Sequence, residues 1–86
     1  MEHRPERGDL YQHFKGGFYI VHTVATDYSD DSNFEEYVVY RKAIKDDSEM
    51  CIRKLSEFTS KVYVGECSEN KIRDRFKFIG NVINHY

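Results

Sequence analysis

Residues 18–25 read FYIVHTVA, a run in which branched and aromatic side chains fill most positions on both alternating sides. Such side chains fit a pleated surface, and an apolar character on both sides predicts a strand that is covered on two faces. A second run of this kind, EEYVVYRKAI, occupies residues 35–44. Residues 26–33 between them are rich in Asp, Ser and Asn, as hairpin loops are. The two runs therefore predict an antiparallel hairpin.

Shorter segments outward from this hairpin complete the predicted fold. An extended segment over residues 10–15 ends at Gly16-Gly17, which marks a tight turn. We expect three further strands and one helical turn, with a polar connection from residue 65 to 74 that holds a second helical turn near residues 70–74. The strands are residues 50–54, 62–64 and 75–79, and the first helical turn is residues 55–58. Five short antiparallel strands without a long amphipathic helix predict a mainly β fold, a small barrel or roll. Its predicted core comprises Phe14, Ile20, Val38, Tyr40, Ile52, Phe58 and Phe76.

The composition supports one small folded domain. The chain has 86 residues, of which 40% are hydrophobic and 33% charged, and this balance excludes a disordered chain. The apolar set contains 7 Tyr and 6 Phe but no Trp, which favours strands. We divide the sequence into a polar N-terminal extension (1–7), a β domain (8–79) and a C-terminal tail (80–86).

Charge, cysteine content and hydropathy limit the partners and the location. The net charge is −2, but residues 27–50 carry −5 while residues 51–86 carry +3. No apolar run approaches the ~20 residues of a membrane span, and the polar start is unlike a secretory signal. We therefore expect a cytoplasmic protein with no membrane partner. Cys51 and Cys67 lack the spacing of a zinc site, so we expect reduced thiols, no metal and no disulfide-linked partner.

Several segments resemble the family DUF1653, a small bacterial domain of unknown function. Residues 8–19, GDLYQHFKGGFY, are close to a G-x-Y-x-H-[FY]-K-G-x-x-Y block, and residues 36–41, EYVVYR, resemble an E-x-V-V-Y segment. The step Ile52-Arg53, then Phe58, and Arg75-Phe76 near the end continue the order. The resemblance covers roughly residues 8 to 79. It implies an SH3-like barrel, in agreement with the strand pattern, and brings no established activity, cofactor or partner.

Polar side chains at five positions form the predicted ligand-binding set: Tyr11, His13, Lys15, Arg53 and Arg75. Tyr11, His13 and Lys15 alternate along an extended segment, so they project to one side, where a hydroxyl, an imidazole and an ammonium suit an anion. A guanidinium at Arg53 or Arg75 can clamp a carboxylate or phosphate. The structural alternative stays open: Tyr11 packs on the barrel, His13 bonds a carbonyl, and the arginines pair with Glu35, Glu36 or Glu57.

These residues favour a binding module over an enzyme. No phosphate loop, nucleophile elbow or paired carboxylates of useful context occur, so we predict no catalytic residues and no cofactor. The first hypothesis is recognition of a small anionic or nucleotide-like ligand. The alternatives are a protein–protein adaptor that uses an aromatic groove with Tyr37, Tyr40 and Tyr63, and a single-stranded nucleic-acid binder that uses stacking and the basic C-terminal third.

Overall fold

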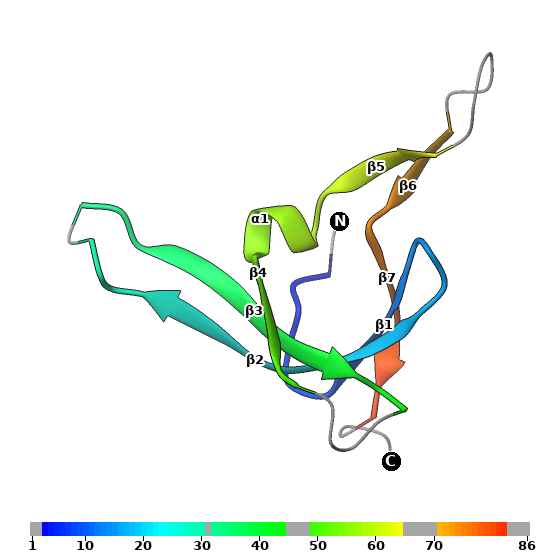
Figure 1. Cartoon of the computed structure of the whole chain (residues 1–86), viewed down its shortest axis with the longest axis horizontal. Coiled ribbons are helices and arrows are strands. Elements are labelled where there is room, and N and C mark those ends of the chain that lie inside the picture. The colour runs from blue at the N-terminus through cyan, green and yellow to red at the C-terminus, as the bar shows by residue number, and fades with distance from the viewer. Residues whose placement is uncertain (1–2, 31, 45–48, 65–70, 83–86) are drawn as a thin grey trace.

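A computed structural model of the protein describes residues 3–30, 32–44, 49–64 and 71–82, and these residues form a mainly β fold (Figure 1). Five antiparallel strands build one sheet in the order β4-β3-β2-β1-β7, while β5 and β6 form a separate two-stranded sheet. The elements are β1 (Asp9–His13), β2 (Phe18–Asp27), β3 (Glu35–Lys42), β4 (Cys51–Lys54), α1 (Leu55–Phe58), β5 (Lys61–Val64), β6 (Lys71–Asp74) and β7 (Phe76–Asn81). The predicted hairpin is therefore β2 and β3, which extend well beyond the other strands.

Two irregularities in the pairing accompany the curvature of the five-stranded sheet. The register between β2 and β3 shifts between Val21 and Thr23, and the register between β1 and β7 shifts between Leu10 and Tyr11. A bulge bends its strand and increases the local twist. The sheet in Figure 1 consequently curls around α1, which lies on its concave side.

The sheet is a roll and not a closed barrel, because its edge strands β4 and β7 do not pair with each other. The segment expected to join the barrel at residues 62–64 is β5, which instead pairs with β6 and projects as a separate arm (Figure 1). The helical turn expected at residues 70–74 is wrong, since residues 71–74 are strand β6. In this arm the backbone partners are Lys61 with Asp74 and Tyr63 with Ile72.

The core lies on the concave face, between the sheet and α1. It is formed by Tyr11, Val21, Val38, Tyr40, Phe58 and Phe76, each no more than 5% exposed. The rings of Phe58 and Phe76 stack with centroids 4.1 Å apart and planes 6° from parallel. Four predicted core residues are thus confirmed, namely Val38, Tyr40, Phe58 and Phe76. The predicted turn over residues 55–58 is also confirmed as α1, which carries Phe58 inward.

The remaining core predictions differ from the structure. Ile52 is 65% exposed, because Cys51 and Arg53 are the residues of β4 that face the sheet's concave side. Phe14 and Ile20 are only half-buried, Phe14 because it lies in the turn after β1 and not within the sheet. The prediction assigned inward positions by side-chain hydrophobicity, whereas the register of a four-residue strand decides which side chains point inward.

The turn between β1 and β2 confirms the tight turn expected at the glycine pair. The amide of Gly16 donates to the carbonyl of His13 at 2.7 Å, and the amide of His13 donates to the carbonyl of Gly17 at 2.7 Å. Gly16 has a φ of +111°, a conformation that residues with a Cβ rarely adopt. This turn fixes the direction in which His13 and its neighbours leave β1.

The N-terminal extension is docked on the sheet from His3 onward. The carboxylate of Asp9, which is fully buried, lies 2.7 Å from Nε2 of His3 and accepts hydrogen bonds from the amide of Glu6 and the side chain of Asn81, at 2.8 Å each. The His3 ring also stacks on Phe78, with centroids 4.0 Å apart. Helix α1, with four residues, is far too short to cross a membrane.

Candidate functional site

The inward face of β1 carries two of the predicted site residues, Tyr11 and His13. The alternation that places them together is confirmed, but their common face is the core face of the sheet. Tyr11 is 4% exposed, and its ring makes edge contacts with Phe58 and Phe78, at centroid distances of 5.0 and 5.6 Å. Tyr11 is therefore a core residue first, as in the structural alternative.

The hydroxyl of Tyr11 is buried beside the carboxylate of Asp9. Its pKa is raised, first by burial, then by the negative charge of Asp9 and a hydrogen bond to the Asp9 side chain, and last by the charge of Glu6. The hydroxyl therefore keeps its proton at neutral pH.

His13 is the residue around which the predicted cations gather. Its ring lies at the end of β1, 4.9 Å from the ring of Phe76 and 4.5 Å from that of Phe14. Its Nδ1 accepts a hydrogen bond from the amide of Lys15 at 3.2 Å, so the neutral ring carries its proton on Nε2. The pKa of His13 is lowered by burial, and then by the positive charges of Arg53, Lys15 and Arg75. The charges of all three predicted cations therefore act on the pKa of His13.

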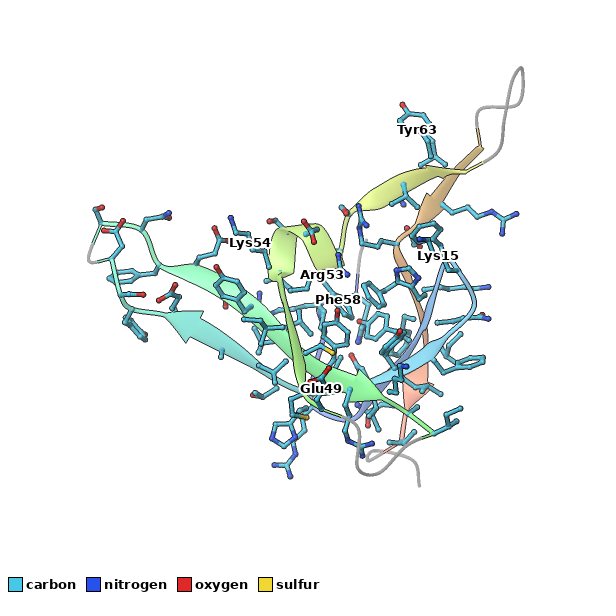
Figure 2. The ribbon with its side chains drawn as sticks, viewed as in Figure 1. Lys15, Glu49, Arg53, Lys54, Phe58 and Tyr63 are labelled. Carbon is cyan, nitrogen blue, oxygen red and sulfur yellow. The ribbon has the colours of Figure 1, made fainter. Side chains whose placement is uncertain are left out.

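Arg53 is held inside the curve of the sheet (Figure 2). Its Nε donates to the hydroxyl of Tyr40 at 3.2 Å, and its Nη1 lies 2.6 Å from a carboxylate oxygen of Glu57. The guanidinium carbon also lies 5.6 Å from the centroid of Phe76. The pKa of Arg53 is raised by these partners, above all by the bond to Tyr40. Arg53 is therefore a brace that pairs with Glu57, the alternative considered from the sequence.

Arg75 and Lys15 have different surroundings. Arg75 connects β6 to β7, and its amide and its Nε donate to the carbonyl and the hydroxyl of Ser60 at 3.0 and 3.1 Å, which continues the pairing of β5 with β6. Its carbonyl accepts from the amide of Phe14 at 3.0 Å. Lys15 is exposed in the turn, with its amine 5.7 Å from the centroid of the Phe14 ring.

Two adjoining hollows lie where the arm meets the sheet. The first, which we call the aromatic cavity, has a volume of about 320 Å³ and is lined by His3, Tyr11, Phe58, Thr59, Lys61, Asp74, Phe76 and Phe78. The second, the cationic groove, has a volume of about 490 Å³ and is lined by Gln12, His13, Phe14, Gly16, Lys61, Ile72, Arg73, Asp74 and Lys77. Both volumes lie in the range of about 300–1,000 Å³ that is typical of ligand pockets. The ion pair of Lys61 with Asp74, 2.6 Å long, borders both.

The predicted set is therefore only partly assembled. His13 lines the cationic groove and Tyr11 lines the aromatic cavity, while Lys15, Arg53 and Arg75 stand around His13 without lining either hollow. Sequence reasoning missed three basic lining residues, Lys61, Arg73 and Lys77. The signal that points to them is the excess of positive charge over residues 51–86.

The aromatic groove of the adaptor hypothesis does not form from the three tyrosines expected. Tyr40 is buried in the core and bonded to Arg53, and Tyr37 is half-buried in β3. Tyr63 is 77% exposed on the arm (Figure 2). Only Tyr63 of the three presents its ring largely to solvent.

Comparison with known proteins gives one match. The family model described as "Protein of unknown function (DUF1653)" matches residues 9–78. Neither the curated proteins nor the solved structures contain a match to this chain.

Proposed function

Since the chain belongs to the DUF1653 family of proteins of unknown function, we propose from its geometry alone that it is a non-enzymatic module that binds a small anionic ligand. The observation that carries the proposal is the lining of the cationic groove. Arg73 and Lys77 are set there beside the ring of His13 and the ion pair of Lys61 with Asp74, so the described lining carries an excess of positive charge. A concave site with one sign of charge concentrates ligands of the other sign.

The surrounding cations strengthen this preference. Burial lowers the pKa of His13 first, and the positive charges of Arg53, Lys15 and Arg75 beside the groove lower it further. Phosphate, sulfate and carboxylate groups accept charge-assisted hydrogen bonds from guanidinium and ammonium groups, which are about twice as strong as neutral ones. Such an anion neutralises charge that the folded protein otherwise holds together.

We expect inorganic phosphate to bind in the groove, and the Lys77→Ala variant to bind it about tenfold more weakly, which corresponds to about 1.4 kcal/mol. Isothermal titration calorimetry at low ionic strength measures both affinities. Lys54→Ala is the matched control, because this lysine is exposed on β4 and lies across α1 from Lys15 (Figure 2). Equal losses in the two variants would mean that only net charge matters and that the groove is not the site.

Anion binding should also raise the pKa of His13. Burial and then positive neighbours lower this pKa in the free protein, so the folded state binds fewer protons than the unfolded state just below pH 6.5. As the pH falls from 6.5 to the lower pKa that His13 has in the folded state, protonation of this residue therefore lowers the free energy of unfolding. A bound anion reverses part of this pKa shift. The affinity of the protein for the anion should therefore increase as the pH falls from 7.5 to 5.5.

NMR titration of the His13 ring protons with and without sulfate measures this effect, since sulfate keeps a constant charge over that range. The ring of His22, which is exposed on β2, provides the internal control. A His13 titration curve that sulfate does not move would contradict binding beside this residue.

A further inference from the structure

We propose that the tip of the β2–β3 hairpin docks in the cationic groove of a second copy of this chain. This surface, which we call the acidic tip, comprises residues 27–30 and 32–35, and it lies at the opposite end of the molecule from the groove (Figure 1). Because the five-stranded sheet separates the two surfaces, one copy cannot place its own tip in its own groove. The docking rests on the proposed function, since the groove must accept anionic groups.

Two aromatic rings at the acidic tip are exposed although they contact each other. Tyr28 and Phe34 are 70% and 54% exposed, and their ring centroids lie 5.1 Å apart. They sit at the end of the hairpin, beyond the other strands and away from the core (Figure 1). Two adjacent exposed rings form an apolar surface, which a concave partner would remove from water.

The rings are accompanied by negative charge. Asp27, Asp30 and Glu35 lie on the acidic tip, and residues 27–40 contain no basic side chain. The carboxylates of Asp27 and Asp30 each accept hydrogen bonds from the hydroxyl and the amide of a serine two residues further on, which keeps them ionised at neutral pH. Among the described residues, none of these three carboxylates has a cationic partner within ion-pair distance.

The cationic groove is complementary to the acidic tip in both respects. Arg73 and Lys77 give its described lining the excess of positive charge, while Phe14 and Ile72 provide apolar wall. An aromatic ring of the tip can therefore pack on apolar side chains while the neighbouring carboxylates face the cations. Opposite charges on two surfaces steer their encounter and fix their orientation, and they disfavour partners of the wrong sign.

Two copies that lie side by side in opposite directions make this contact twice. Each acidic tip then meets the groove of the other copy, and a two-fold axis closes the pair. Each contact is small, because one aromatic residue buries about 150–250 Å², whereas a stable interface buries about 1,200–2,000 Å² in total. We therefore expect a weak dimer, with a dissociation constant on the order of 100 μM at low salt.

Sedimentation velocity at low ionic strength, over about 10–500 μM protein, measures this association. Lys77→Glu and Asp30→Lys should each weaken dimerisation at least tenfold, because each brings like charges together. Mixing the two variants should restore it, since the mixed dimer has one native contact and one contact with its charges exchanged. Lys54→Glu and Glu49→Lys are the matched controls, at exposed positions outside both surfaces (Figure 2). Neither control, alone or mixed, should change dimerisation.

A further pair of variants tests the apolar part of the contact. Phe34→Ser should weaken dimerisation severalfold, whereas Ile44→Ser, at a residue that is 89% exposed outside both surfaces, should leave it unchanged. Thermal midpoints verify that both variants remain folded. Phosphate should shift the protein toward monomer more than sodium chloride of equal ionic strength does, because phosphate competes with the acidic tip for the groove.

The outcomes separate the docking from the anion site. A wild-type protein that stays monomeric up to 500 μM but binds phosphate would overturn the docking and leave the proposed function standing. A dimer that Lys77→Glu retains would also overturn it, because association then uses another surface. If the charge variants behave as expected and phosphate neither binds nor competes, the docking is supported and the small-anion site is wrong.

Discussion

Replacing Phe58 with alanine should lower the free energy of unfolding by about 3–5 kcal/mol, the range observed when large aromatic residues are removed from cores. Phe58 is 1% exposed and stacks on Phe76 at 4.1 Å. It also meets the rings of Tyr11 and Tyr40, at centroid distances of 5.0 and 5.4 Å. Phe58 lies in the single turn of α1. A helix of this length cannot shift far enough to fill the cavity that the substitution would leave.

Urea unfolding followed by circular dichroism measures this loss. Since small domains are stable by only about 5–15 kcal/mol, the variant should unfold at a much lower midpoint. Phe14→Ala is the matched comparison, because Phe14 is half-buried in the turn, and we expect it to cost clearly less. Similar midpoints for Phe58→Ala and the wild type would show that α1 does not cover the core.

Replacing Asp9 with alanine should cost about 3 kcal/mol, the second largest effect that we expect. Its fully buried carboxylate accepts from the amide of Glu6 and the side chain of Asn81, and it contacts His3. Removing the carboxylate takes a charged acceptor from these part-buried groups, and a hydrogen bond to a charged group contributes about 1.5–3 kcal/mol. The loss combines interactions within the N-terminal turn and across to the end of β7.

Thermal and urea unfolding of Asp9→Ala, Asp9→Asn and Asp27→Ala test this. Asparagine keeps one acceptor oxygen and should recover part of the loss. The side chain of Asp27 is exposed and, among the described residues, accepts hydrogen bonds from Ser29, so its removal should leave the unfolding midpoints nearly unchanged. An Asp9→Ala variant as stable as Asp27→Ala would mean that the buried network contributes nothing.

Local sequence predicts the central hairpin and the helical turn because each is specified by its own residues. The β-branched and aromatic runs of β2 and β3 fit no other element, and Phe58 lies in a short turn that can only carry it inward. Strand β6 was missed because Lys71–Asp74 contains one apolar residue among charged ones. Its strand character comes from pairing with β5, which no pattern within the segment reveals.

The candidate site shows the same division between local and distant causes. Alternation correctly places Tyr11 and His13 on one face, but only the path of the whole sheet makes that face the core. Arg73 and Lys77 become neighbours of His13 because β1 pairs with β7 and the amide of Phe14 donates to the carbonyl of Arg75. Those hydrogen bonds join segments from different elements, so spacing along the chain gives no sign of them.

The pairing of β1 with β7 has a consequence for the order in which the protein folds. Asp9 is the backbone partner of Asn81, so the sheet joins strands that lie more than sixty residues apart. Closing so long a loop costs entropy before its contacts form, which places such topologies among the slower small folders. Phe76, which stacks on Phe58, belongs to this same late strand. During synthesis β1, β2, β3 and α1 therefore all emerge before β7, and their shared core lacks Phe76 until residues 76–81 leave the ribosome.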